Sequence, residues 1–296
     1  MDNYNCWACD FSDKTGEGNL ARLFVKKKFT KNNYQIFTLD NIKILNFLNG
    51  KLLNCKYFSP IIGILFCWYL FLRRKRLVYL NYLPLWNFLL FIFLPPSTLL
   101  GPITGGALYK NNDQLFIRKY LFPLFYRVSL FFLKYRNAKL IFSTSLLKKY
   151  VPRKLRKKID FNFVFNLIKK RAKKNKNIDF VIYYRQHKNK INFFPYELVK
   201  KISIQGYKVI IVGDYLNITS VVNKGFVSNK KLQELLSRAK YTVASEENIY
   251  SIFVIESINN NVKILVSKSS KKRIKDQYKN FIFYSSKKID KKLYKC

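Results

Sequence analysis

The chain has 296 residues, of which 49% are hydrophobic, so it can bury a core in one large domain or two modest ones, which excludes a wholly disordered protein. The 56 Lys and Arg residues against 16 Asp and Glu give a formal net charge of +40, which indicates an anionic partner: a membrane surface, a phosphorylated ligand or a nucleic acid. A lysine- and asparagine-rich composition also fits an AT-rich coding sequence, a reading that needs no partner.

The cysteines and the histidine do not form the pattern of a metal-binding site. Cys6 and Cys9 form a single CxxC without a second pair nearby, and His187 is the one histidine of the chain. A structural zinc site needs four ligands, so we predict no metal and no cofactor. Scattered, unpaired cysteines favour a reducing compartment, and we expect a cytoplasmic protein.

The chain opens with a strand pattern over 5–11, a glycine-containing loop over 12–18 and a helix that begins near Asn19. A strand, a glycine loop and a helix N-terminus form the usual anion-binding entrance of an open α/β sheet. The loop residues predicted to contact a ligand are Gly16, Glu17 and Gly18.

Two long uncharged segments follow, 57–72 and 77–109. Ser59 is a plausible N-cap and Pro60 a plausible first helical residue, so a helix over 60–72 would rise about 20 Å, short of the roughly 30 Å of a bilayer core. Prolines and glycines interrupt the second segment, which lipid tolerates poorly. We expect buried helices and strands, or a face that rests on a membrane; a true span is the alternative.

Strand candidates at 76–84, 97–106 and 137–144 alternate with helix candidates at 60–72 and 114–135. Strands separated by helices predict a parallel, doubly wound sheet for an N-terminal domain of residues 1–165.

A lysine-dense stretch, "NLIKKRAKKNKN", then marks a change in composition. Like charges favour an extended chain, so residues 166–176 are interpreted as a linker to a C-terminal domain of residues 177–296. A basic arm that grips nucleic acid is the alternative.

The second half alternates strands and helices with short links. The predicted strands are 179–185, 207–214, 223–228, 240–245 and 262–267, and the predicted helices are 193–206, 229–239 and 249–260. This pattern predicts a second Rossmann-like domain, with a ligand at the carboxyl ends of its strands in a cleft between the two domains.

Three of the 16 acids, Glu246, Glu247 and Glu256, fall within the eleven residues that follow strand 240–245. Carboxylates at such a junction can accept hydrogen bonds from sugar or ribose hydroxyls, while the helix N-terminus attracts phosphate. Arg185 and Lys190 follow the first strand of this domain at the same edge, where they could balance a diphosphate.

These motifs occur in an order known from one family. Four residues separate Arg185 from Lys190, a strand ends in Gly213 ("VIIVGD"), and "NKGFVSNKKLQELLSRAKYTVAS" leads into "SEENIYSIFVIESINNNVKILVS". Residues 176–267 thereby resemble the donor domain of GT-B fold glycosyltransferases of the retaining family 4, or group 1, type. The family's fold is two Rossmann-like domains that face across a cleft.

The resemblance assigns roles residue by residue. It implies that Arg185 and Lys190 hold the donor diphosphate and that Glu256 bonds the ribose hydroxyls. The first glutamate of the signature falls on Asn248, with Glu247 one position early, so Glu247 takes the catalytic, sugar-contacting role only if the turn shifts by one residue. Further donor contacts are implied for Ser245, Tyr250, Ser251 and Gly213. Asn261 stands where the family usually has glycine, and the acceptor-domain histidine of many members is absent.

The first half resembles the acceptor domain, with "DKTGEGNLARLF" as its first glycine loop. The resemblance implies a metal-independent, retaining transfer of a sugar from a nucleotide-diphosphate donor to a glycan or lipid-linked acceptor in surface polysaccharide synthesis. The basic, aromatic first domain would rest on the anionic inner face of the cell membrane. The alternatives are a basic nucleic-acid-binding protein, a non-catalytic membrane protein and an inactive copy of the enzyme.

Overall fold

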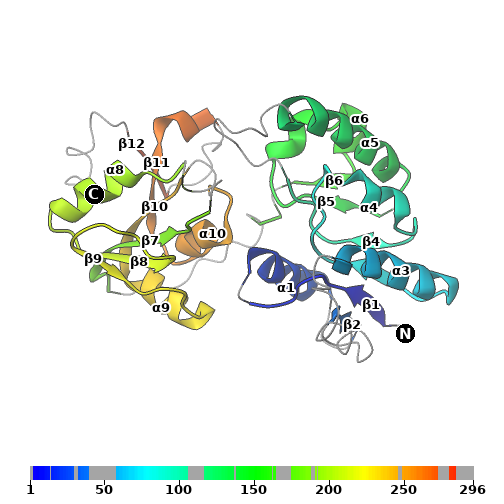
Figure 1. Ribbon diagram of the computed structural model, residues 1–296, viewed down its shortest axis with the longest axis horizontal. Helices are drawn as coiled ribbons and strands as arrows, with labels where there is room; N and C mark the ends of the chain where they lie inside the picture. The colour runs from blue at the N-terminus through cyan, green and yellow to red at the C-terminus, as the bar shows by residue number, and fades with distance from the viewer. Residues whose placement is uncertain are drawn as a thin grey trace. The chain divides into compact units, whose positions relative to one another are not determined.

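The computed structural model describes residues 3–13, 15–29, 33–39, 58–105, 117–136, 138–161, 163–164, 175–187, 191, 193–245, 249–272 and 280–284. These residues form two compact units (Figure 1): unit 1 holds the described residues up to Phe163, and unit 2 those from Val164 onward. Most of the predicted linker 166–176 lies outside the described residues, so its role stays a prediction.

Unit 1 is built on a parallel sheet with the order β2-β1-β3-β4. Its strands are β1 (Tyr4–Trp7), β2 (Tyr34–Phe37), β3 (Leu77–Tyr79) and β4 (Leu99–Leu100), and a bridge between Ile103 and Phe142 leads on to the parallel pair β5 (Leu140–Ile141) and β6 (Ile159–Asp160). Its helices are α1 (Gly16–Lys28), α3 (Ser59–Leu72), α4 (Phe88–Phe93), η3 (Ile117–Leu121), α5 (Phe122–Lys134), η4 (Leu146–Tyr150) and α6 (Arg153–Arg156).

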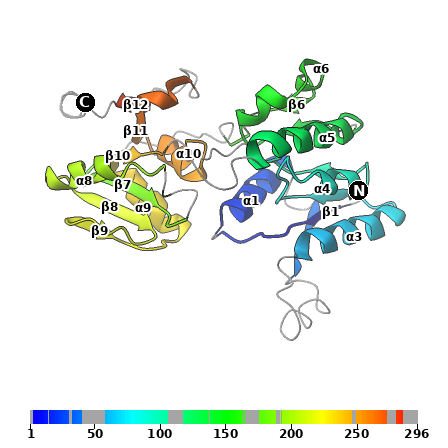
Figure 2. The ribbon, with the colours of Figure 1, turned by 45° about the horizontal axis from the view of Figure 1, so that its top comes forward.

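The helices of unit 1 divide between two faces of its sheet. The crossovers from β2 to β3, β3 to β4 and β4 to β5 all step in one direction, whereas that from β1 to β2 steps in the other. Because such crossovers are right-handed, α3, α4 and α5 cover one face and α1 covers the other. Figure 2 shows α3, α4 and α5 grouped together and α1 apart from them. Gly63 lets α3 approach β1 closely, since a Cβ there would lie 2.2 Å from Nε1 of Trp7.

Unit 2 is a six-stranded parallel sheet with the order β12-β11-β10-β7-β8-β9. Its strands are β7 (Ile178–Tyr184), β8 (Val209–Gly213), β9 (Val221–Asn223), β10 (Ala239–Val243), β11 (Lys263–Ser267) and β12 (Phe281–Tyr284). Helix α8 (Tyr196–Ile204) packs on one face, and α9 (Asn229–Arg238) and α10 (Ile252–Asn259) pack on the other, while η6 (Lys268–Lys272) follows β11. Counted in chain order this is the 3-2-1-4-5-6 arrangement of a Rossmann sheet.

The predicted fold class is confirmed: the chain is an α/β protein with a parallel, Rossmann-like sheet in each unit. Two of the predicted boundaries need correction. The first helix begins at Gly16 rather than near Asn19, because Oγ1 of Thr15 caps it by accepting the Gly18 N–H at 2.9 Å. The predicted strand over 223–228 lies at 221–223 instead.

The first apolar segment forms a helix as predicted, but Ser59 is not its N-cap. Phe58 occupies that position, and Ser59 is the first helical residue, with Pro60 in the first turn. The 14 residues of α3 rise about 21 Å, and no helix in the described part of the chain has the length and apolarity to cross a bilayer. The expectation of a buried helix is wrong for one side of α3, which is exposed. The other expectation, a face that rests on a membrane, stays a prediction.

Candidate functional site

The unit 2 sheet has its topological switch point between β7 and β10. From β7 the chain first winds outward to β8 and β9, and it then returns to β10 on the other side of β7. Ligands of open α/β sheets bind outside the carboxyl ends of the strands at such a point. Arg185 directly follows β7, and Ser245 follows β10 by two residues, so both predicted contacts lie at this edge.

Arg185 is turned toward the β8 and β9 side of the edge. Its Nε lies 3.6 Å from Oδ2 of Asp214, and its guanidinium carbon lies 5.3 Å from the centre of the Phe226 ring. The side chain remains 38% exposed, so an anion can reach it. Neither Asp214 nor Phe226 was predicted as a site residue. Asp214 could have been found in the same way as Arg185, because it too is a charged residue directly after a buried strand.

Asp214 fixes the turn that carries Arg185. Its Oδ2 accepts the Gln186 N–H at 2.6 Å, and its own N–H donates to the Tyr184 carbonyl at 3.0 Å. Gly213 makes this closeness feasible: it has φ +107°, and a Cβ there would lie 2.2 Å from the Tyr184 oxygen. The predicted site residue Gly213 therefore has a steric reason to be glycine.

Tyr183 links the end of β7 to the helix that follows β10. Its ring stacks on Phe253 in the first turn of α10, with centroids 5.5 Å apart. Burial raises the pKa of the Tyr183 hydroxyl, and the neighbouring Arg185 guanidinium opposes that shift. Arg185 and the N-terminal turn of α10 therefore share Tyr183 as a neighbour.

The N-terminus of α10 is capped by the residue that precedes it. Oγ of Ser251 accepts the Val254 N–H at 3.3 Å, so this hydroxyl is engaged in helix capping. Tyr250 lies half-buried in the turn before it, and Ser245 is buried at the end of β10. The positive end of the α10 dipole thus lies at the carboxyl edge of the sheet, where it favours an anion.

Glu256 lies in the second turn of α10. It is half-exposed, whereas every other residue from Phe253 to Asn260 is buried. Its Oε2 accepts the Nδ2–H of Asn259 at 3.4 Å. Past the end of the helix, Asn261 has φ +56°, a left-handed conformation that suits glycine and that Asn adopts more readily than most residues. This conformation accounts for asparagine at the position where the resembled family has glycine.

Several predicted residues are not placed. Lys190, Glu246, Glu247 and Asn248 lie outside the described residues, so the roles assigned to Lys190, Glu247 and Asn248 stay predictions. Among the residues that the structure does describe, no three His, Cys, Asp or Glu side chains gather as metal ligands.

Unit 1 has a switch point of its own, between β1 and β3. Buried Asn81, just after β3, ties the loops at this edge together. Its Oδ1 accepts the Cys9 N–H at 3.0 Å, and its Nδ2 donates to the carbonyls of Asp10 at 2.5 Å and Glu17 at 3.3 Å. None of Asn81, Cys9 or Asp10 was predicted as a site residue, because their meeting depends on which strands are neighbours.

Glu17 lies within this network, in the first turn of α1. Its Oε2 accepts the N–H of Tyr82 at 3.4 Å, and Tyr82 has an uncommon φ of +56°. Burial raises the pKa of the Glu17 carboxyl; the Tyr82 hydrogen bond opposes this, and the negative charge of Asp10 adds to it. This edge of unit 1 therefore holds a half-buried carboxyl group whose pKa is higher than the ordinary value of a glutamate.

The predicted glycine loop needs a correction, because Gly16, Glu17 and Gly18 are helical rather than part of a loop. Gly18 lies so close to the chain before α1 that a Cβ would meet the Ser12 oxygen at 2.2 Å. Gly16, in contrast, has open space around it. Close packing thus explains one of the two glycines and leaves the other without a steric role.

No protein-family model and no curated protein sequence matches the chain. Among solved structures, the chain is similar to the UDP-GlcNAc 2-epimerase of Methanocaldococcus jannaschii in complex with UDP-GlcNAc and UDP, with 11% identity, a TM-score of 0.48 and coverage of 96% of this chain and 89% of that one. An alpha-glucosyltransferase in complex with UDP and a 13-mer DNA shows 12% identity, a TM-score of 0.41 and coverage of 96% and 82%. The E. coli heptosyltransferase WaaC with ADP-2-deoxy-2-fluoro heptose shows 8% identity, a TM-score of 0.36 and coverage of 95% and 92%. The fold described above rests on the strand orders of the two sheets, not on these likenesses.

Proposed function

We propose that unit 2 binds a nucleotide-diphosphate sugar and that the protein transfers the sugar to a glycan or lipid-linked acceptor, as in surface polysaccharide synthesis. One observation supports this most: the switch point of a Rossmann-type sheet carries Arg185 and a capped helix N-terminus at one edge, with Glu256 in the second turn of that helix. An arginine and a helix N-terminus suit a diphosphate, and a half-exposed carboxylate suits ribose hydroxyls.

Arg185 would stabilise the negative charge that develops on the diphosphate as the glycosidic bond breaks. Asp214 is the positioning residue in this scheme, because it holds both the arginine and the backbone of the turn. Lys190 would add a second cation, so the transfer needs no metal ion. Glu247 would contact the sugar, in the role that the family resemblance gives to its first glutamate, with the turn shifted by one residue from Asn248.

Unit 1 would bind the acceptor. Glu17, with its raised pKa, would accept a hydrogen bond from the acceptor hydroxyl that becomes the new glycosidic oxygen. Retention at the anomeric carbon is proposed on the family resemblance alone, and NMR of the product gives its anomeric configuration directly.

Arginine substitutions in unit 2 test the diphosphate contact. Arg185→Ala should lower the turnover of a nucleotide sugar by roughly a hundredfold, because it removes charge stabilisation from the leaving group. Arg238→Ala is the matched control, since Arg238 is 42% exposed, lies 4.0 Å from the Glu234 carboxylate and belongs to the carboxyl end of α9. Equal losses in the two variants would remove the assignment.

Carboxylate substitutions test the nucleoside contact. Glu256→Ala should raise the KM for the nucleotide sugar by roughly tenfold with a smaller effect on kcat, since ribose is held alike in ground and transition states. Glu197→Ala, an exposed acid in the first turn of α8, should leave both constants unchanged. An unaltered KM in Glu256→Ala would contradict the ribose contact.

A further inference from the structure

Helix α3 presents an apolar stripe to solvent. The exposed side chains Ile61, Leu65, Trp68 and Leu72 recur at intervals of three and four residues, so they share one side of the helix. The opposite side, with Gly63 and Cys67, is buried against the sheet. A soluble surface helix normally has polar residues on its outer side, and the stripe therefore calls for a partner.

The neighbouring helices extend this apolar surface. Nε1 of Trp68 donates to the Phe93 carbonyl at 2.6 Å, which ties α3 to the end of α4, and the rings of Phe88 and Phe125 lie 5.1 Å apart between α4 and α5. Since α3, α4 and α5 form one layer, their exposed residues share the outer face of unit 1. Further exposed apolar side chains of this face are Leu89 and Phe93 on α4, and Leu124 and Phe131 on α5.

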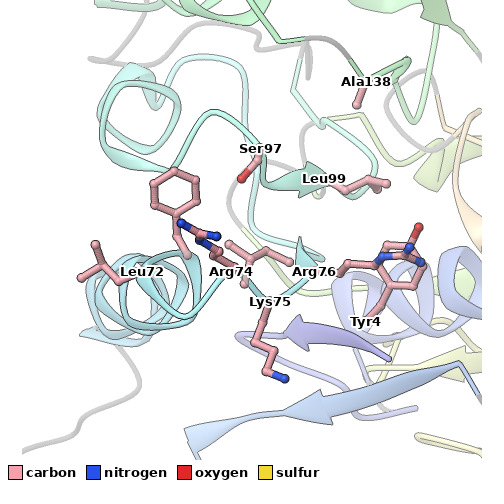
Figure 3. Close-up of a pocket in the computed structure, with 10 residues that line it drawn as sticks. Tyr4, Leu72, Arg74, Lys75, Arg76, Ser97, Leu99 and Ala138 are labelled. Carbon is pink, nitrogen blue, oxygen red and sulfur yellow. The ribbon is translucent and has the colours of Figure 1, made fainter. Parts of the chain in front are cut away.

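Basic residues border the apolar face. Arg73, Arg74, Lys75 and Arg76 follow α3 directly, and all four are exposed. The last three line a pocket of about 820 Å³ at the amino ends of β1, β3 and β4 (Figure 3). The remaining lining residues are uncharged: Tyr4, Phe71, Leu72, Leu77, Ser97, Leu99 and Ala138. The pocket therefore suits a phosphate group beside an apolar chain.

Basic side chains of unit 1 also lie against exposed tyrosine rings, namely Tyr69, Tyr120 and Tyr135. The guanidinium carbon of Arg73 lies 4.4 Å from the ring centre of Tyr69, and the ammonium groups of Lys119 and Lys134 lie 5.2 and 5.6 Å from the rings of the tyrosines that follow them. Tyrosine, tryptophan and long basic side chains concentrate where a bilayer meets water, because their apolar parts and polar ends prefer different depths.

From these observations we infer that the outer face of α3, α4 and α5 docks on the surface of an anionic lipid bilayer, with lipid phosphates at the Arg74–Arg76 pocket. The charge of this part of the chain favours an anionic bilayer over a second copy of the chain as the partner of this face. Between residues 41 and 159 the sequence has one acid, Asp113, against 21 Lys and Arg residues, so two copies of the face would repel each other. This inference does not depend on sugar transfer. The anionic inner face of a cell membrane is such a surface.

Vesicle sedimentation with the full chain tests the apolar contact. The protein should sediment with vesicles of equal parts phosphatidylcholine and phosphatidylglycerol, and Leu65→Ser with Leu72→Ser should lower the bound fraction at least roughly fivefold. Ile204→Ser on α8 is the control, since Ile204 is 74% exposed and Leu72 is 77% exposed. An equal loss in the control, or no sedimentation of the wild type, would overturn the inference.

A second pair of variants tests the charge. Arg74→Glu with Lys75→Glu should reduce the bound fraction at least roughly fivefold, whereas Lys200→Glu with Lys201→Glu makes the same change of charge on exposed residues of α8 and should reduce it little. Equal binding to vesicles of phosphatidylcholine alone would overturn the role of anionic lipid. Light scattering tests self-association. A stable dimer of the wild type that becomes a monomer in the variant with Leu65→Ser and Leu72→Ser would overturn the inference and assign the face to contact between two copies.

Discussion

The Glu17 side chain combines half-burial, a hydrogen bond from the Tyr82 N–H and an acidic neighbour in Asp10. Because its pKa is raised in the folded chain, the folded state binds this proton more tightly than the unfolded state does. Its contribution to stability is therefore present at low pH and is lost as the pH rises through the raised pKa.

Glu17→Gln tests this sign. At about pH 7.5 the variant should have a higher free energy of unfolding than the wild type, whereas at about pH 3.5, where both side chains are neutral, the two should agree. Denaturant unfolding of the variant and the wild type at both pH values gives the comparison. If the variant were less stable than the wild type at the higher pH, the half-buried Glu17 carboxylate would not destabilise the folded state, and the prediction would be wrong.

Single residues were predictable where their signal is local. Arg185 follows a strongly apolar strand, and that position alone puts it at the carboxyl edge of a parallel sheet. Its ion pair with Asp214 depends on β7 and β8 being neighbours, and the Asn81 bonds depend on β1 and β3 being neighbours. A single sequence does not encode such adjacencies in its periodicity, so these partners were missed.

At the scale of elements, Arg136 closes the end of α4. This buried guanidinium donates to the carbonyls of Phe91, Leu94, Pro95, Pro96 and Thr98. Desolvation lowers its pKa to about 10, which leaves it charged near neutral pH. The helix end therefore gains its hydrogen-bond donors from the residue that follows α5 by two positions.

Arg136→Met should lower the free energy of unfolding by about 2–4 kcal/mol, because several buried carbonyl groups lose their donor at once. Arg127→Met changes an exposed residue of α5 and should cost no more than about 0.5 kcal/mol. Urea unfolding of both variants decides the point, and similar midpoints for the two would contradict the capping role.

The helices and strands also differ in how accurately they could be predicted from the sequence. Helix α3 was placed within one residue because Pro60 and a long apolar run mark its start. The two-residue strands β4 and β5 and the six-residue helix α4 carry too few residues to show a period. The strands were therefore predicted only as the broad candidates 97–106 and 137–144, and α4 was not predicted. These short elements depend on tertiary packing rather than on a local sequence pattern.

For the whole molecule, alternating strands and helices were enough to predict two parallel α/β sheets, because parallel strands need helical crossovers. The strand order of unit 2 was not derivable from that alternation, and this order creates the switch point between β7 and β10. The proposed donor site therefore depends on a property of the entire sheet, and whether a nucleotide sugar binds there is the central question.

A thermal-shift series with UDP-, GDP- and ADP-sugars, on the wild type and on Arg185→Ala, asks that question most directly. The proposed site predicts that at least one of these compounds raises the Tm of the wild type by about 2 °C or more and that Arg185→Ala loses most of the rise, while Arg238→Ala keeps it. No rise with any nucleotide sugar, or an equal rise in Arg185→Ala, would contradict a donor site at the carboxyl edge of this sheet.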